Sequence, residues 1–305
     1  MEKTKIVFFG THEFAASILQ GLIDFPFFEI ALVVTQPDQP VGRKQILTPP
    51  LTKVIAQKHK ILVVQPETLK NFEFSVTDFD LSIVIEYGRI IPERFLSIPK
   101  YGTINIHPSL LPLYRGPTPI QAALVYGDKQ TGVTIMQMDA TMDTGPILLQ
   151  KKVDVKPHDT FTTLRDKLMP LALEALLETI PNFIDGTITA KAQNNNLATY
   201  CKLLTREDGK IDWTKNTNEI YNQYRALTPW PGVWTLWGEK RVKLLETIPG
   251  ALTLTTGKIT FDTGKIYIGT SDGSLQILSL QLEGKPVMDA KAFINGYKTI
   301  DGTLL

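Results

Sequence analysis

Two polar residues alternate with isoleucines in the short run Thr103–His107. If this run is a β-strand, Asn105 and His107 point to the same face, with alpha carbons about 6 to 7 Å apart. An amide and an imidazole placed in this way can both reach one reacting carbonyl group. The alternative is a hydrogen-bonded pair that only caps the strand, and the pair by itself favours this alternative.

A second polar cluster lies in the loop Asp139–Gly145, which offers the carboxylates of Asp139 and Asp143. Such a loop is more often a turn than a site. The first turn after a predicted strand, Gly10–Phe14, contains one glycine, and neither a P-loop motif nor GxSxG occurs in the sequence. Dehydrogenases, P-loop proteins and α/β-hydrolases are therefore disfavoured. The lone Cys201 and four histidines show no CxxC or HExxH spacing, so we predict no metal site.

The polar strand belongs to a series of short apolar runs separated by segments of helical periodicity. This alternation predicts a doubly wound, mostly parallel α/β sheet, in which ligands bind beyond the carboxyl ends of the strands. The predicted strands are Lys5–Gly10, Ile30–Thr35, Ile61–Gln65, Leu81–Ile85, Thr103–His107 and Val133–Met138. The predicted helices include Leu51–His59, Thr118–Tyr126 and Thr160–Asp185.

The periodicity changes after the Pro229–Gly232 break. Short runs punctuated by Gly, Thr and Asp follow, and they are typical of a small antiparallel β-barrel of OB-like type. We therefore predict an α/β domain over residues 1–189, a linker over 190–207 and a C-terminal β-barrel domain over 208–305. The predicted strands of the barrel are Val233–Trp237, Arg241–Glu246, Lys258–Phe261, Lys265–Ile268 and Leu275–Leu280.

Composition narrows the class of protein. The chain has 305 residues, of which 43% are apolar and 21% charged, and its formal net charge is +1. These values exclude fibrous and disordered classes, and the bulk charge indicates no particular partner. The N-terminal apolar run is too short for a signal peptide or an anchor, and the single cysteine fits a reducing compartment. We expect a cytoplasmic monomer without membrane attachment.

The motifs around the polar strand resemble those of the methionyl-tRNA formyltransferase family, and the likeness runs nearly from end to end. The N-x-H, SLLP and DTG elements, at Asn105–His107, Ser109–Pro112 and Asp143–Gly145, mark the wider group that takes formyl from 10-formyltetrahydrofolate. The Gln36–Asp38 segment and the attached C-terminal domain narrow the resemblance to the enzymes that act on tRNA. Further matching segments are Phe9–Thr11, Gly132–Asp139, Glu207–Gly209, Ile211–Trp213 and Pro229–Gly232.

The resemblance implies that formyl passes from 10-formyltetrahydrofolate to the free amino group of initiator methionyl-tRNA, for translation initiation and without a metal. Carried over by motif position, Asn105, His107 and Asp143 become the catalytic trio. Asn105 would then donate a hydrogen bond to the oxyanion, and His107 would move the proton near neutral pH. Asp143 would hold the imidazole in one orientation and favour its charged form.

The resemblance also implies a folate pocket beside the trio. Tyr87 and Gly88 end the preceding predicted strand and are expected to line it, although packing of a buried tyrosine explains Tyr87 equally well. Simple packing between a strand and a helix is the alternative for the SLLP run. The expected folate contacts are Ser109, Leu110, Leu111, Pro112, Tyr87 and Gly88.

Basic residues are the candidates for tRNA contact. Arg43 and Lys44 lie in a segment without clear helical or strand periodicity, which predicts an exposed, mobile loop able to reach RNA. Lys202 and Arg206, at the predicted linker, complete the expected tRNA contacts. The sequence departs from the family pattern at Gly42–Leu47, which loses a glycine and positive charge, and at Glu86, which adds a carboxylate beside the expected folate pocket.

Two other functions stay open at this point. Formyl transfer to an amino sugar on a nucleotide would use the same catalytic trio. A catalytically inactive folate- or RNA-binding module would bind folate without turnover. A product assay with the two acceptors distinguishes all three.

Overall fold

The computed structural model describes residues 3–42, 44–74, 76 and 78–305. The chain divides into two compact units. The first consists of Met1–Pro119, Gln130–Asp154 and Arg165–Cys201, and the second of Ile120–Lys129, Val155–Leu164 and Lys202–Leu305. The chain therefore passes between the units several times, and the domain limits predicted from the sequence stay a prediction.

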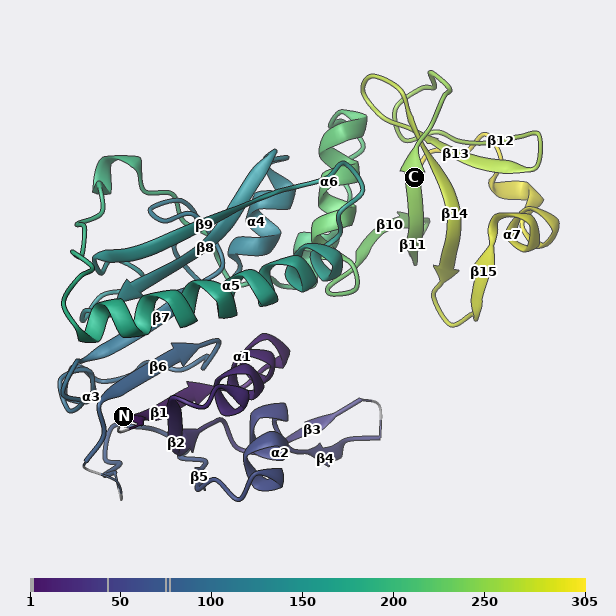
Figure 1. Cartoon of the computed structure of the whole chain (residues 1–305). Coiled ribbons are helices and arrows are strands. Elements are labelled where there is room, and N and C mark those ends of the chain that lie inside the picture. Colours follow the sequence, from purple (N-terminus) through teal and green to yellow (C-terminus); the bar gives the residue numbers. More distant parts are fainter. Residues whose placement is uncertain (1–2, 43, 75, 77) are drawn as a thin grey trace. The chain divides into compact units, whose positions relative to one another are not determined.

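A seven-stranded sheet forms the centre of the first unit, in the order β5-β2-β1-β6-β7-β8-β9 (Figure 1). Neighbours from β5 to β7 are parallel, whereas β8 and β9 extend the sheet in antiparallel fashion. The strand order reverses between β1 and β6, and ligands of such sheets bind at this point, outside the carboxyl ends of the strands. The strands are β1 (Thr4–Gly10), β2 (Phe28–Val34), β5 (Val63–Val64), β6 (Leu81–Ile85), β7 (Thr103–His107), β8 (Gln130–Gln137) and β9 (Ile147–Asp154).

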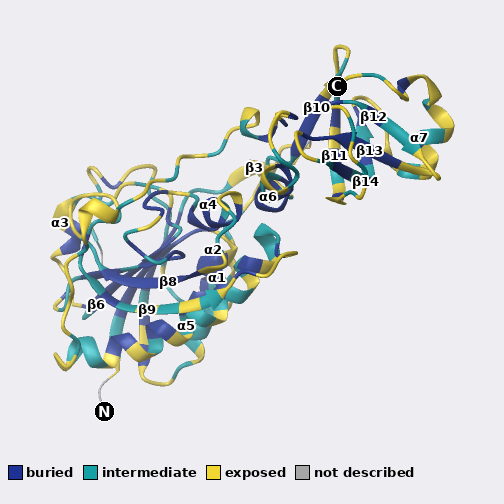
Figure 2. Ribbon diagram, turned by 90° about the horizontal axis from the view of Figure 1, so that it is seen from above, coloured by how far each residue is buried: buried dark blue, intermediate teal, exposed yellow. Residues whose placement is uncertain are grey.

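The central strands form because their side chains are apolar on both faces. All five residues of β6 and the last five of β1 are buried, and Figure 2 shows β6 and β8 in dark blue. Phe9, Tyr87 and Phe95 belong to a core cluster at this sheet. Each such side chain contributes about 2 kcal/mol by leaving water, which makes the strand ends a firm support for a site.

Helices of the first unit contact its sheet. Helix α1 (Glu13–Asp24) and helix α2 (Leu51–Lys58) contact each other, and both contact strand β2. The helices are α1 (Glu13–Asp24), α2 (Leu51–Lys58), α3 (Glu93–Leu96) and the greater part of α5 (Phe161–Ile184).

A small hairpin corrects one expectation. The segment around residues 39–48, expected to be an irregular loop, forms β3 (Gln39–Val41) and β4 (Ile46–Thr48), paired from Gln39–Thr48 to Val41–Ile46. Strands of three residues are too short to produce a recognisable periodicity, which is why the sequence did not predict them. The residues of both strands are exposed, as expected.

The second unit contains a six-stranded antiparallel sheet in the order β10-β11-β14-β13-β12, with β15 pairing to β14. The predicted combination of a doubly wound, mostly parallel sheet with a C-terminal antiparallel β domain is confirmed. The strands are β10 (Val233–Trp237), β11 (Lys240–Pro249), β12 (Ile259–Asp262), β13 (Lys265–Gly269), β14 (Ser274–Leu282) and β15 (Val287–Asp289). Helices α4 (Pro119–Val125), α6 (Thr217–Leu227) and α7 (Ala290–Gly296) belong largely to this unit.

The start of α6 illustrates how local sequence sets an element. The Asn216 side chain accepts the Glu219 backbone N–H at 2.9 Å, and the Glu219 carboxylate accepts the Asn216 N–H at 3.1 Å. This reciprocal capping satisfies two backbone donors that the first helical turn leaves unpaired. Within the described part of the chain, every helix is too short or too polar to cross a bilayer.

Candidate active site

Asn105 and His107 lie in β7, which has the predicted bounds and is flanked by β6 and β8. Across the pairing with β8, Asn105 is opposite Met136 and His107 is opposite Thr134. Ile104 and Ile106, which alternate with the two polar residues, are buried. Since side chains alternate along a strand, the amide and the imidazole share the other face. The strand that carries the two residues has the predicted bounds, and the roles of both residues stay a prediction.

The imidazole of His107 is held by a backbone carbonyl. Its side chain is 4% exposed, and Nε2 lies 2.9 Å from the carbonyl oxygen of Tyr114. A carbonyl oxygen can only accept, so Nε2 carries the hydrogen. In the neutral ring the unprotonated nitrogen is therefore Nδ1, and this nitrogen is available to take up a proton.

Asp143 approaches that nitrogen from the loop between β8 and β9. Its Oδ2 lies 3.7 Å from His107 Nδ1, which is an ion-pair distance when the ring is protonated and too long for a hydrogen bond. The same oxygen accepts the Gly116 backbone N–H at 2.8 Å. The structure thus brings His107 and Asp143 together, while the ring's hydrogen bond goes to Tyr114.

The Ser109–Pro112 segment folds back onto β8 and β9. Ser109 is fully buried and its hydroxyl donates to the Leu113 carbonyl at 2.6 Å. Thr134 joins this loop to the sheet, because its hydroxyl donates to the Ser109 carbonyl at 2.7 Å and accepts the Leu111 N–H at 3.1 Å. Leu111 is buried as well, whereas Leu110 and Pro112 keep part of their surface in solvent.

Tyr87 follows β6 and packs into the core cluster, with its ring 5.5 Å from that of Phe9. Its carbonyl accepts from the Thr11 hydroxyl at 3.1 Å and from Gln36 Nε2 at 2.8 Å. Its hydroxyl is buried and has no hydrogen-bond partner among the described atoms. Gly88 is exposed with φ of 74°, a conformation that a side chain would strain.

Glu86 is a further titratable group at this edge. Burial raises the pKa of its carboxyl to about 7, against the opposing effects of the Arg165 charge and the Phe14 backbone N–H. The charge of Glu13 acts in the same direction as burial. The departure from the family pattern noted at this position therefore places a carboxyl that is partly protonated at neutral pH beside Tyr87.

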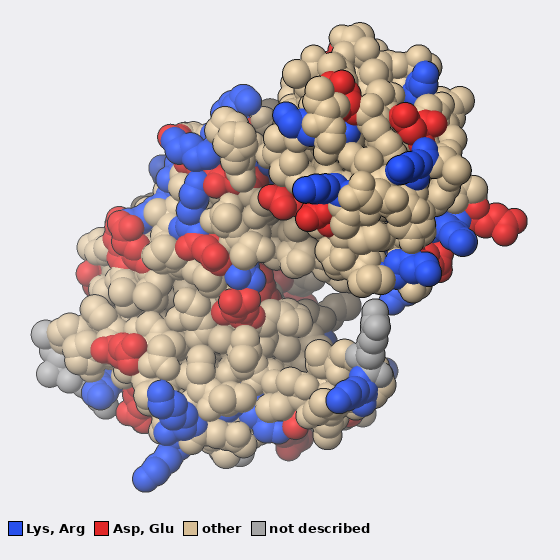
Figure 3. Space-filling model, turned by 90° about the vertical axis from the view of Figure 1, so that its right-hand side faces the viewer, with Lys and Arg blue, Asp and Glu red and all other residues tan. Residues whose placement is uncertain are grey.

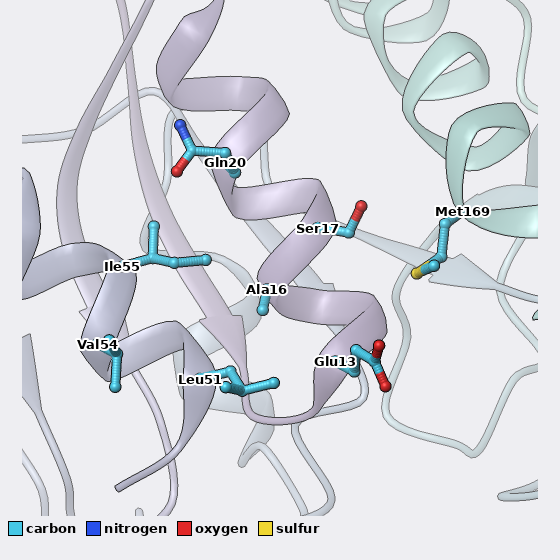
Figure 4. Close-up of a pocket in the computed structure, with 8 residues that line it drawn as sticks. All are labelled: Glu13, Ala16, Ser17, Gln20, Leu51, Val54, Ile55 and Met169. Atoms are coloured by element: carbon cyan, nitrogen blue, oxygen red, sulfur yellow. The ribbon is translucent and has the colours of Figure 1, made fainter. Parts of the chain in front are cut away.

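The described residues of the first unit line a groove and a smaller hollow. A groove of about 380 Å³ runs along α1 and α2, and Met169 of α5 points toward α1 across it (Figure 4). None of the predicted site residues lines this groove. A smaller hollow of about 250 Å³ lies at the carboxyl ends of β1 and β2, between Thr11 and the base of the β3–β4 hairpin. The smaller hollow is at the sheet edge where ligands of this fold bind.

The predicted tRNA-binding residues occupy different surroundings. Arg43 lies outside the described residues, and Lys44 is exposed at the tip of the β3–β4 hairpin. In the second unit, Lys202 Nζ is 2.7 Å from Asp208 Oδ1, and this contact helps to hold the pKa of Asp208 at about 2. The Lys202 side chain is 78% exposed, and Arg206 is exposed too.

Sequence reasoning missed the groups that contact the imidazole of His107 and the carboxylate of Asp143. The Tyr114 carbonyl and the Gly116 N–H are backbone groups, so the residue types at these positions do not reveal their contacts. Arg115, between them, has an exposed fraction of only 2% and hydrogen bonds to Gln193 and Asn195.

The same fold is found in solved structures of other proteins. One similar solved structure is an N-formyltransferase from Helicobacter canadensis in complex with folinic acid and dTDP-3-aminofucose, with a TM-score of 0.67, 21% identity and coverage of 91% of this chain and 98% of that chain. Another is HypX from Aquifex aeolicus in complex with tetrahydrofolic acid, with a TM-score of 0.65, 18% identity and coverage of 100% of this chain and 49% of that chain. At these identities the likeness shows the fold alone.

The chain belongs to the formyl transferase family: the formyl transferase model matches residues 4–180, and the model of the formyl transferase C-terminal domain matches residues 203–298. It is 45% identical to a methionyl-tRNA formyltransferase of Caldicellulosiruptor saccharolyticus, over 98% of this chain and 99% of the relative. It is 42% identical to a protein of the same name from Thermodesulfovibrio yellowstonii, over 97% of each chain. The family predicted from the sequence motifs is confirmed.

Proposed function

We propose that this protein transfers a formyl group from 10-formyltetrahydrofolate to the free amino group of initiator methionyl-tRNA. The observation that carries the proposal is the pairing of His107 Nδ1 with the Asp143 carboxylate at the carboxyl end of β7. Relatives named methionyl-tRNA formyltransferase, similar over nearly the whole chain, support this choice of acceptor. In this proposal the protein works as a monomer in the cytoplasm, where charged initiator tRNA enters translation.

Each member of the trio has a separate task in the proposed reaction. The bound folate supplies a formyl carbon on a nitrogen that must leave. His107 accepts at Nδ1 the proton that the attacking amine loses as its nitrogen bonds to that carbon, and later returns the proton to the leaving nitrogen as the old carbon–nitrogen bond breaks. Asn105 donates a side-chain N–H to the formyl oxygen, where negative charge develops. Asp143 stabilises the imidazolium that exists between the two proton transfers.

The residues at the sheet edge fit a flat heterocycle with polar margins. Leu110 and Pro112 keep partly exposed apolar surface, and the buried Tyr87 hydroxyl leaves a polar group without a protein partner among the described atoms. We assign these residues and Gly88 to the folate pocket. We assign Ser109 and Leu111 to the same pocket as residues that hold its loop in place. The Ser109 hydroxyl donates to the Leu113 carbonyl, and the Leu111 N–H donates to the Thr134 hydroxyl.

For the tRNA, we propose contacts from Arg43, Lys44, Lys202 and Arg206. Lys202 is paired with Asp208, but an exposed ion pair contributes little stability and can exchange its carboxylate for a phosphate. We also propose that residues 1–189 form the formyl-transfer domain, 190–207 a linker, and 208–305 a domain that helps to hold tRNA. The match of a separate C-terminal family model to residues 203–298 supports such a division.

A product assay tests the proposal. The protein is incubated with 10-formyltetrahydrofolate and either methionyl-tRNA or an amino-sugar nucleotide. Formylmethionyl-tRNA is the expected product. Formylation of the sugar alone would assign the protein to the other acceptor class, and folate binding without any formylated product would indicate an inactive binding module.

A further inference from the structure

We infer that Gln193 is a positioning residue for the catalytic pair and acts through Asp143. Its side-chain amide joins two chain segments. Nε2 donates to the carbonyl of Asp143 at 2.9 Å and to that of Gly145 at 2.8 Å, while Oε1 accepts from Arg115 Nε at 3.1 Å and Nη2 at 2.8 Å. The inference rests on the proposed roles of His107 and Asp143.

The backbone of Asp143 needs such support. Its φ is +54°, in the left-handed region that residues with a side chain rarely adopt and that persists only where surrounding contacts hold it. Gln193 holds the carbonyl of this residue, and the Gly116 N–H holds its carboxylate. Together the two contacts determine where Oδ2 lies relative to His107 Nδ1.

Arg115 determines which way the Gln193 amide faces. The guanidinium is almost completely buried and donates to the side-chain oxygens of Gln193, Asn195 and Tyr200. Because a guanidinium has donors only, Oε1 of Gln193 must face Arg115. Nε2 is then turned toward the carbonyls of Asp143 and Gly145, so the donors and acceptors match on both sides of the amide.

Arg115 also belongs to the segment that orients the imidazole. The carbonyl of its neighbour Tyr114 accepts from His107 Nε2, and the Arg115 N–H donates to the Thr199 carbonyl at 2.9 Å. A second backbone pairing, between Lys191 and Ile147 at 2.7 and 2.8 Å, fixes the chain on the other side of Gln193. One side chain in the predicted linker therefore ties the segment that holds His107 to the segment that carries Asp143.

Two substitutions separate positioning from simple support of the fold. Gln193→Glu keeps an oxygen for Arg115 but turns a second oxygen toward the two carbonyls, whereas Gln193→Ala removes both sets of contacts. Asn195→Ala is the matched control, because Asn195 accepts from Arg115 and, among the described residues, forms no hydrogen bond with Asp143 or Gly145. Turnover, both Michaelis constants, the dependence of turnover on pH and the melting temperature are measured for each variant.

We expect Gln193→Ala and Gln193→Glu to lower kcat by about 10- to 100-fold, as misplacement of a reacting group does, with both Michaelis constants changed by about twofold or less. The pH profile of Gln193→Glu should shift, while its melting temperature stays near that of the parent. Asn195→Ala should keep near-parental turnover.

Parental turnover in folded Gln193→Glu, or an equal loss of turnover in Asn195→Ala, would overturn the inference. If Gln193→Ala does not fold, Gln193→Glu alone decides the question. His107→Ala is measured in parallel: if it keeps turnover, the proposed catalytic roles fail, and if it loses turnover while both Gln193 variants keep theirs, only the positioning role fails.

Discussion

Two different groups lie at the two nitrogens of the His107 imidazole, a backbone carbonyl at Nε2 and a carboxylate near Nδ1. The Tyr114 carbonyl fixes the hydrogen on Nε2, and the Asp143 carboxylate lies 3.7 Å from Nδ1. In a serine-protease triad, one carboxylate both orients the ring and stabilises its charge. Because the tasks are divided here, loss of the Asp143 charge should weaken proton transfer without releasing the ring.

Asn105→Ala tests the proposed oxyanion contact. Removal of a donor aimed at developing negative charge is expected to lower turnover by about 100- to 1,000-fold, while the dissociation constant for the folate stays nearly unchanged. Single-turnover rates and folate titration measure the two quantities. A folded variant with near-parental turnover would remove Asn105 from the mechanism.

Glu86 gives the protein a stability that depends on pH. The pKa of its carboxyl is about 7 in the folded chain and 4.5 in the reference state, so the folded state binds the proton more tightly. Stability from this group is complete below about pH 4.5 and is lost as the pH rises through about 7, by at most about 3.5 kcal/mol at about 1.4 kcal/mol per pKa unit.

Glu86→Gln should therefore raise the melting temperature relative to the parent at pH 8 and leave it almost unchanged at pH 5. Thermal unfolding of both proteins at the two pH values provides the measurement. A difference in melting temperature that is the same at pH 5 and pH 8 would show that ionisation of Glu86 is not its cause.

At the scale of elements, the β3–β4 hairpin combines an exposed tip with a fixed base. Both carboxylate oxygens of Asp38 lie 2.8 Å from Lys53 Nζ on α2, and Gln65 donates to Asp38 at 2.7 Å. The hydrogen bond from Lys53 is the main reason that the pKa of Asp38 is lowered. The hairpin can thus present Lys44 to a ligand from a defined position.

Substitution in this hairpin should affect the tRNA and not the folate. We expect Arg43→Ala and Lys44→Ala to raise the Michaelis constant for methionyl-tRNA several-fold, because each removes a positive charge available to phosphate. Lys58→Ala, which removes an exposed charge from the last turn of α2, is the matched control. If both variants have the same kinetics as the control, neither residue contributes to tRNA binding.

Elements with continuous apolar runs were predictable, and those with mixed composition were not. β6 has the predicted bounds because a buried parallel strand leaves a clear apolar signal, and β7 has them because its isoleucines alternate with polar residues. β9 was not predicted, because this edge strand alternates partly buried residues with exposed lysine and aspartate. Asn105 and His107 could be proposed from spacing on one strand, whereas the contacts of Gln193 depend on a fold that joins residues about fifty positions apart.

The chain has 32 Lys and Arg against 31 Asp and Glu, so any attraction for tRNA must come from local clusters. Figure 3 shows Lys and Arg interspersed with Asp and Glu on the face it presents. In the second unit, the β10–β11 hairpin carries Lys240, Arg241 and Lys243. Arg241 lies 3.9 Å over the Trp234 ring and 3.6 Å from Glu207, while the two lysines are exposed. The lysines are therefore the better candidates for phosphate contact.

Affinity for tRNA should fall steeply with salt, and the double substitution Lys240→Ala and Lys243→Ala should flatten that dependence. Each lost phosphate contact is expected to reduce the slope of log K against log salt by about 0.9 or slightly less. Lys265→Ala, at the exposed start of β13, is the control. The affinity for tRNA is measured by binding titrations at several salt concentrations. An affinity that does not change with salt would contradict the proposed electrostatic attraction.

The central claim is that His107 transfers the proton during formyl transfer to methionyl-tRNA. Its most direct test is the single-turnover rate of formylmethionyl-tRNA formation by the parent and by His107→Asn, with saturating 10-formyltetrahydrofolate and confirmed folding. We expect the parent to form product and the variant to be slower by about 100- to 10,000-fold, the usual contribution of a general acid or base. Formation of product at the parental rate by the folded variant would contradict the account.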